Sequence, residues 1–175
     1  DLDVLLALAN LYLQTGRVRE ASNQYQRALT VEPDFVDEPL PETDGFSDPD
    51  QLLEAVETLE ELVAKYPAAP AFHVHLGDLY VKTGNQAGAV EQYRAALEAQ
   101  PDLLEATVKL GTQHLRMGRY VDAAQTFNRA VELNDRLMLA FVGLAIAQHA
   151  AGNQKEALAT LDLAASLEPV SYTHL

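Results

Sequence analysis

The segment AFHVHLGDLYVKTGNQAGAVEQYRAALEAQP, from Ala71 to Pro101, contains the pattern that decides the fold. Its first half places Leu76, Leu79 and Tyr80 at the i, i+3, i+4 spacing of an amphipathic helix, and Gly84 follows where that helix would end. Its second half has small and aromatic residues at helical spacing before the proline, which cannot continue a helix. The segment therefore predicts two helices joined by a short turn.

The same pattern recurs with a period of 34 residues over most of the chain. The glycines that would end the first helices are Gly16, Gly84, Gly118 and Gly152. Four further sets align in the same register without insertion: Ala21, Ala55, Ala89, Ala123 and Ala157; Tyr25, Leu59, Tyr93, Phe127 and Leu161; Ala28, Leu62, Ala96, Ala130 and Ala164; Pro33, Pro67, Pro101, Asp135 and Pro169. Such agreement predicts a repeat architecture, in which each unit packs on its neighbours.

Each aligned position has a physical role in a stack of helix pairs. A small residue such as Gly77 or Gly111 lets a neighbouring helix approach closely, and the alanines do the same on the second helix. The aromatic residue or leucine one turn further on is expected to fill the space between units. Glycine after the first helix supplies the left-handed backbone of a helix stop at low cost.

This pattern resembles the tetratricopeptide repeat. The segment from Ala71 to Pro101 is the clearest copy, and it keeps the signature residues Leu76, Gly77, Tyr80 and Gly84. The resemblance implies an all-α fold, a right-handed superhelical solenoid of antiparallel helix pairs. We expect five units, at residues 2–35, 36–69, 70–103, 104–137 and 138–169, followed by a tail at 170–175 that fits no repeat position and is interpreted as non-native. Apolar residues on more than one side of the first and last helices favour the interpretation that the chain is an excerpt.

The second unit departs from the pattern, because its first helix is replaced by an acidic, proline-rich segment at residues 34–50. Two interpretations stay open for this segment. It is either an irregular loop that covers the same core edge through Leu40 and Phe46, or a functional acidic element that docks a basic partner or binds calcium weakly. The helix that follows has a normal apolar stripe, with Asp50 as its expected cap.

Composition excludes several classes of function. The chain has 175 residues and a formal net charge of −14, which argues against nucleic acid or an anionic membrane as the main partner. Twelve carboxylates and no Lys or Arg lie between Ala28 and Ala64, so one segment holds nearly all of the excess charge. The absence of Cys excludes disulfides and thiol chemistry without identifying the compartment.

No residues form a recognisable catalytic or metal-binding pattern, so we expect no enzyme activity and no cofactor. His73 and His75 are two apart, and on a helix they point in different directions. His114 occupies an aromatic position, where a packed and hydrogen-bonded ring is expected. The glycines stand singly, which excludes a phosphate-binding loop.

In the family that the chain resembles, the first helices line a concave groove. Carried over position by position, the groove residues are Val74, Asp78, Val81, Lys82, Val108, Thr112, Leu115, Arg116, Leu139, Val142, Ile146 and His149. This set predicts a mostly apolar strip with charge at its edge, for a partner or for an adjacent segment of the same protein. Only Asn10 fits the scheme by which some relatives hold a chaperone's carboxylate tail.

The sequence thus predicts a non-catalytic scaffold or adaptor that binds an apolar or amphipathic protein segment in the concave groove. Two alternatives remain open. The chain is a regulatory or substrate-recruiting region of a larger enzyme, such as a glycosyltransferase or kinase, or it is a self-assembly module that uses the same apolar surface.

Overall fold

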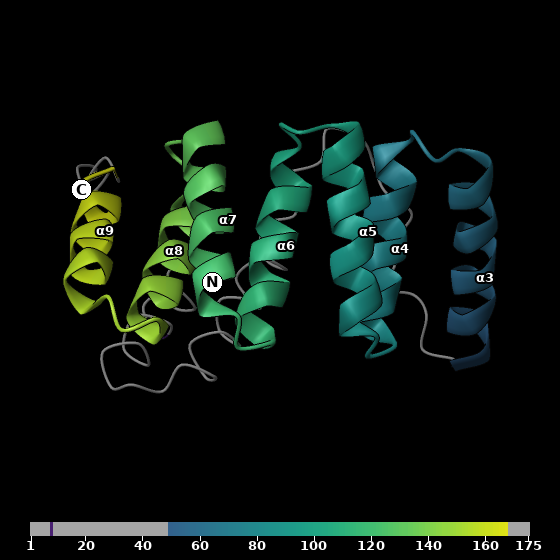
Figure 1. Ribbon diagram of the computed structural model, residues 1–175, viewed down its shortest axis with the longest axis horizontal. Helices are drawn as coiled ribbons and strands as arrows, with labels where there is room; N and C mark the ends of the chain where they lie inside the picture. The colour runs from purple at the N-terminus through teal and green to yellow at the C-terminus, as the bar shows by residue number, and fades with distance from the viewer. Residues whose placement is uncertain (1–7, 9–48, 168–175) are drawn as a thin grey trace, which may run out of the picture.

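The computed structural model describes residue 8 and residues 49–167, and the helices in this part form a single row (Figure 1). Consecutive helices run antiparallel and are joined by short turns, which confirms the predicted all-helical stack of antiparallel pairs. With the labels of Figure 1, the helices are α3 (Pro49–Lys65), α4 (Pro70–Lys82), α5 (Gln86–Ala99), α6 (Leu104–Arg116), α7 (Tyr120–Leu133), α8 (Met138–Ala150) and α9 (Gln154–Leu167).

The turns after α4, α6 and α8 have one geometry, because a glycine with positive φ ends each of these helices. The φ angles are +80° at Gly84, +72° at Gly118 and +91° at Gly152. After α4, the Gly84 N–H donates to the Val81 carbonyl at 3.2 Å and the Asn85 N–H to the Tyr80 carbonyl at 2.8 Å. This pair of bonds satisfies carbonyls that the helix end leaves without partners, and it recurs after α6 and α8.

Within a pair, the two helices touch where the sequence places its smallest residues. A Cβ atom at Gly77 would lie 2.6 Å from the Tyr93 ring, and one at Gly111 would lie 2.9 Å from the Phe127 ring. The alanines of the second helices that face this contact are fully buried: Ala89, Ala96, Ala123 and Ala130. The expectation that Gly77 and Gly111 let a neighbouring helix approach closely is therefore confirmed, and in both pairs the group that approaches is an aromatic ring.

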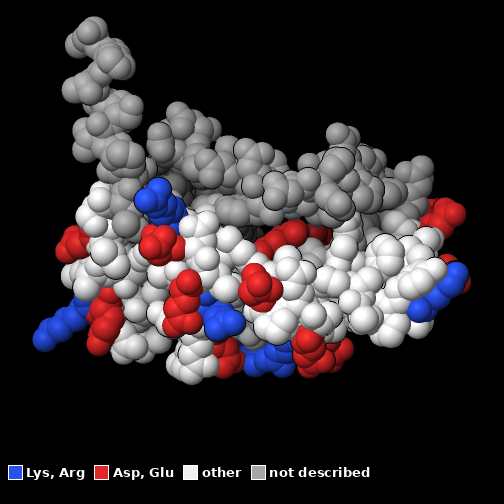
Figure 2. Space-filling model, turned by 90° about the horizontal axis from the view of Figure 1, so that it is seen from above, with Lys and Arg blue, Asp and Glu red and all other residues white. Residues whose placement is uncertain are grey.

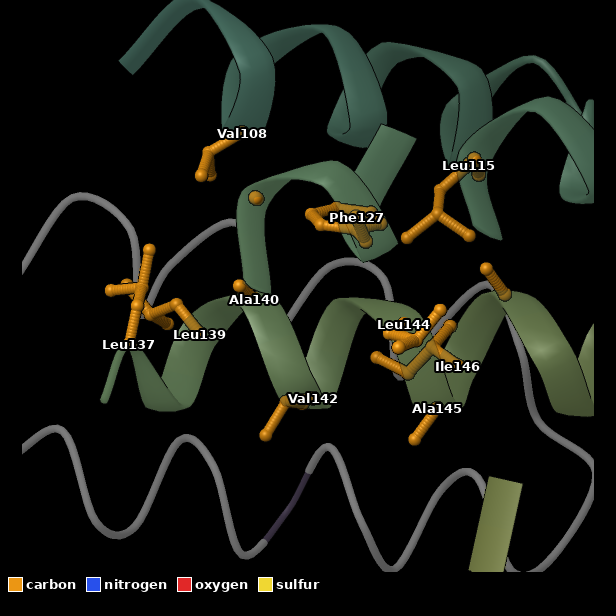
Figure 3. Close-up of a cluster of buried hydrophobic side chains, with 13 residues drawn as sticks. Val108, Leu115, Phe127, Leu137, Leu139, Ala140, Val142, Leu144, Ala145 and Ile146 are labelled. Carbon is orange, nitrogen blue, oxygen red and sulfur yellow. The ribbon is translucent and has the colours of Figure 1, made fainter. Parts of the chain in front are cut away.

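Successive pairs share their cores through the aromatic residues of the second helices. Figure 3 shows Phe127 of α7 between α6 and α8, with Leu144 of α8 on its other side. Phe127 has no exposed surface, and a Cβ atom at Gly143 of α8 would lie 2.6 Å from its ring. One ring thus joins the core of its own pair to the core of the next pair.

Helix α3 packs on α4 with the apolar stripe that the sequence predicts. Val56 is buried and forms a cluster with Leu76 and Leu79 of α4. The expectation that Asp50 caps this helix is wrong, because α3 begins at Pro49 and Asp50 lies in its first turn. Proline suits the first turn, whose N–H groups have no partner within the helix. The first unit apart from residue 8, together with Leu40, Phe46 and the tail, lies outside the described residues.

Candidate functional site

The predicted groove residues occupy one face of each of the first helices α4, α6 and α8. On α4, Val74, Asp78 and Val81 are spaced by four and three residues, and Lys82 adjoins them in the last turn. The same positions recur on α6 and α8 at the 34-residue offset. Residues at i, i+4 and i+7 share a helix face, so each set forms one surface.

The apolar members of this set are buried within the chain. Six of the seven apolar members expose 4% of their surface or less: Val74, Val108, Leu115, Leu139, Val142 and Ile146. Thr112 is buried to the same degree, and Val81 is the exception. Val74 belongs to the cluster of α4, α5 and α6, and the other five belong to the cluster around Phe127. These side chains therefore expose little surface to a partner.

The remaining members form an accessible row at the ends of the first helices. Lys82 and Arg116 are exposed in the last turns of α4 and α6, and His149 is partly exposed in the last turn of α8. The Lys82 and Arg116 cations suit this position, because carbonyl groups at a helix C-terminus carry partial negative charge. Val81 and Asp78 are also partly exposed. We call Lys82, Arg116 and His149 the basic row.

Asp78 lies at the centre of a polar cluster that ties α4 to α5 and α6. Its Oδ1 accepts a hydrogen bond from the Tyr93 hydroxyl at 2.6 Å, and its Oδ2 accepts one from Lys109 Nζ at 2.5 Å. Lys109 Nζ also lies 2.9 Å from Glu105 Oε1. We call Asp78, Tyr93, Glu105 and Lys109 the polar cluster.

Electrostatics in the polar cluster follow from partial burial. Burial alone would lower the pKa of Lys109, but the carboxylates of Asp78 and Glu105 raise it on balance. Burial raises the pKa of Tyr93 well above its ordinary value, and the neighbouring Asp78 carboxylate adds to this. Both groups therefore keep their protons at neutral pH and act as donors to Asp78.

Sequence reasoning found Asp78 and missed its partners. Lys109 lies outside the positions carried over from the family, and it contacts a residue 31 positions earlier in the chain. The available signal was the i, i+4 pair of Glu105 and Lys109 on one helix. Such a pair usually indicates a solvated face, so it did not point to a cluster between helices.

The histidines in the described part of the chain do not assemble into a metal site. His73 Nε2 donates to the Pro67 carbonyl at 2.9 Å, and its Nδ1 lies 2.8 Å from the Gln92 side-chain amide. His75 is buried, and this burial lowers its pKa despite the nearby Asp78 carboxylate. In residues 49–167, no group of three or more His, Asp or Glu side chains is arranged to hold a metal ion.

His114 is packed as expected, but the expected hydrogen bonding is incomplete. The ring exposes 2% of its surface, and its Nδ1 has no hydrogen-bond partner among the described residues. Burial lowers the pKa of His114 to about 4, with a further contribution from the Arg119 guanidinium. The ring is therefore neutral at physiological pH. The neighbouring Gln113 Oε1 is buried without a partner as well.

The described surface carries charges of both signs. On the face drawn in Figure 2, acidic and basic side chains are interspersed over the described residues, with uncharged surface between them. Among the described helices, none combines the length and the apolar character that crossing a bilayer requires. The candidate site is thus the face of α4, α6 and α8, with the polar cluster inside and the basic row at its accessible edge.

A stack of antiparallel helix pairs with this turn geometry and this pattern of small and aromatic residues defines the class of helical repeat proteins. One family model of the tetratricopeptide repeat matches residues 50–103 and 108–171. A second model of the same repeat matches residues 2–35. The chain belongs to the tetratricopeptide repeat family. Members of this family are commonly protein-binding modules.

Solved structures show the same fold. A crystal structure of MamA is 18% identical, with a TM-score of 0.68 over 99% of this chain and 96% of that chain. A second MamA structure is also 18% identical, with a TM-score of 0.65 over 91% and 94%. A tetratricopeptide repeat protein from Parabacteroides merdae is 19% identical, with a TM-score of 0.61 over 97% and 68%. Among curated proteins, no sequence matches this chain closely enough to count as a relative.

Proposed function

We propose that this chain is a non-catalytic scaffold that binds a segment of another protein along the face of α4, α6 and α8. The observation that carries this proposal is the basic row: Lys82 and Arg116 occupy the same repeat position in the last turns of α4 and α6, and His149 lies one position earlier in the last turn of α8. A row along a solenoid suits an extended or helical partner segment, because equivalent contacts recur from unit to unit.

The chemistry of the row favours an amphipathic partner. Carboxylates on the partner would pair with Lys82 and Arg116, and apolar side chains would pack against the partly exposed Val81. Exposed ion pairs contribute only about 0.2–1 kcal/mol each, so they orient the partner more than they hold it. The buried strip that includes Val142 and Ile146 keeps the face rigid, and the partner contacts its edge.

A selected peptide tests this proposal. Peptides are selected from a random display library on the full chain, and the dissociation constant of the best binder is measured for the parent and for Lys82→Glu and Arg116→Glu. Each charge reversal is expected to weaken binding roughly two- to tenfold. Arg136→Glu is the matched control, since Arg136 is exposed but lies outside the row. Equal weakening by all three reversals would contradict the assignment of the face.

A second candidate function is self-assembly, and one observation on α9 favours it. Leu158 exposes 57% of its surface and Leu163 exposes 52%. Val90 occupies the position of Leu158 two units earlier, exposes 4%, and packs in the cluster with Ala106 and Leu110 of α6. If this face binds another copy, the sedimentation mass rises with concentration for the parent and stays monomeric for Leu158→Glu. A mass that does not change with concentration would exclude self-assembly.

A further inference from the structure

One position of the repeat is filled by a ring in two units and by a small side chain in the unit between them. The three equivalent residues are His73 on α4, Thr107 on α6 and Phe141 on α8, each 34 residues apart. His73 exposes 6% of its surface and Phe141 exposes 3%, so both rings are buried. The structure thus shows that this position accommodates an aromatic ring.

The surroundings of His73 show how a ring is held there. Its Nε2 donates to the carbonyl of Pro67, in the turn before α4, and its Nδ1 meets the side-chain amide of Gln92 on α5. The ring therefore bridges the preceding turn and the second helix of its own unit. The residues at the equivalent positions one unit later are Pro101 and Thr126.

At Thr107 the same space is a cavity. The Thr107 hydroxyl donates a hydrogen bond at 3.0 Å to the carbonyl of Leu103, four residues earlier. The threonine side chain is too short to reach α7. A cavity of about 370 Å³ opens at this position. Its walls come from α5, α6, α7 and the turn before α6: Leu97, Pro101, Thr107, Leu110, Gln125, Thr126 and Arg129. Both Pro101 and Thr126 line it, as the equivalence with Pro67 and Gln92 requires.

We propose that this cavity binds an aromatic side chain of a partner protein, next to a carboxylate in the same partner segment. Leu97 and Leu110 supply apolar walls for a ring, and Gln125 and Thr126 supply polar groups. The cavity is open to solvent, and its volume exceeds the roughly 150 Å³ of an enclosed engineered cavity that binds benzene in another protein, so a phenyl ring has room to enter.

The carboxylate in this proposal follows from Arg129 at the cavity. Its side chain is 53% exposed, and its Nη1 lies 3.9 Å from Glu132 Oε2, which is a loose ion pair. The guanidinium is therefore available to a second carboxylate or to the face of the bound ring. The site lies between α5 and α7 and shares no residue with the basic row. The proposal therefore goes beyond the proposed function, and its test is independent of that function.

Three matched peptides test the cavity by NMR titration of the full chain. The probe is acetyl-Ser-Gly-Asp-Phe-Gly-Ser-amide, and the two comparison peptides replace its Phe with Ala or its Asp with Asn. We expect saturable shifts of the Leu97, Leu110 and Gln125 amides with the probe. The Ala peptide is expected to bind roughly tenfold more weakly or worse, and the Asn peptide roughly two- to fivefold more weakly.

Variants at Thr107 separate the cavity from the rest of the surface. Thr107→Phe places a ring in the cavity, as Phe141 does one unit later, and is expected to weaken the probe at least roughly tenfold. Thr107→Val keeps the cavity open and is expected to bind the probe as the parent does. Thr107→His is the second filling variant if the phenylalanine variant does not fold. Absence of saturable shifts at the lining residues, or equal binding by the parent and a folded filling variant, would overturn the proposal.

Discussion

Gly77 and Gly111 show how single missing methyl groups set the distance between paired helices. A Cβ atom at Gly77 would lie 2.6 Å from Cε1 of Tyr93, a separation that real Cβ atoms do not show. Tyr93 is buried and its hydroxyl is bonded to Asp78, so the ring cannot move without breaking that bond. The glycine is therefore required by packing, while its own backbone is ordinary helix.

Gly77→Ala is expected to lower the free energy of unfolding by about 1–3 kcal/mol, because the added methyl overpacks the contact with Tyr93. Alanine favours helix over glycine by up to about 1 kcal/mol, which reduces the loss without reversing it. Urea denaturation measures the change. The control is the same substitution in a Tyr93→Leu background, where the loss should shrink. An equal loss in both backgrounds would show that the ring is not the cause.

His114 makes stability depend on pH at the residue scale. Its folded-state pKa of about 4 lies below the ordinary value of 6.5, so the unfolded chain binds the proton more tightly. The stabilising effect is fully present above pH 6.5 and is lost as the pH falls towards 4. Between pH 7 and pH 5, this group should remove about 2 kcal/mol from the free energy of unfolding.

The measurement compares urea denaturation at the two pH values for the parent and for His114→Phe, which keeps a ring and removes the titration. The variant should lose less stability on acidification than the parent by roughly this amount. His75 acts in the same direction, because burial lowers its pKa too, and it remains in both proteins. An identical loss in the two proteins would show that His114 is not buried as a neutral ring.

At the scale of helices, α7 packs on its neighbours through a small buried residue on one turn and a large buried residue on the next turn. Ala123 and Phe127 both have no exposed surface, and both belong to the cluster that joins α6, α7 and α8. The alanine permits close approach of α6, and the ring fills the gap to α8. A bulky charged side chain at the first position therefore has no route to solvent.

Ala123→Arg is expected to lower the free energy of unfolding by about 1–3 kcal/mol through overpacking alone. The burial of an unpaired charge adds to this loss. Thermal unfolding followed by circular dichroism measures this. Val121→Arg is the matched control on the same helix, since Val121 is 62% exposed and its substitution should leave the midpoint nearly unchanged. Equal midpoints for parent and Ala123→Arg would disprove the helix register.

At the scale of the whole molecule, stability is set by contacts between neighbours along the row. Within the described residues, α3 packs on α4 and α9 packs on α8, whereas each of the helices α4 to α8 packs on both of its neighbours. In such arrays each unit depends on the interfaces beside it, so damage to one interface weakens the helices on both of its sides.

A substitution in one interface should therefore speed hydrogen exchange most in the helices next to it. Native-state exchange read by mass spectrometry or NMR tests this expectation. Ala123→Arg should speed exchange in α6 and α8 more than in α3, because the loss spreads through adjacent interfaces. Uniform protection along the row would mean that the array unfolds as one cooperative block.

The helices, the turns and the alternation of small and large residues follow from the amino-acid sequence alone. These features are local, since the glycine turn needs only its own backbone freedom and the helical stripe needs only its own spacing. The 34-residue period then extends a single local solution along the chain. Because the period is regular, the groove positions of the family could be carried over residue by residue. They place Asp78 and the basic row on one face of the first helices.

The burial and the partners of the residues on those faces depend on how the helices pack together. Whether Val142 is surface or core depends on what packs against it, and a helix pattern cannot state that. The bonds of Lys109 to Asp78, and the cavity beside Thr107, arise between side chains of different repeats, whose sizes and charges differ from unit to unit. Burial and pairing are properties of groups brought together by packing, and the periodic signal that identifies a repeat averages over the differences that create a site.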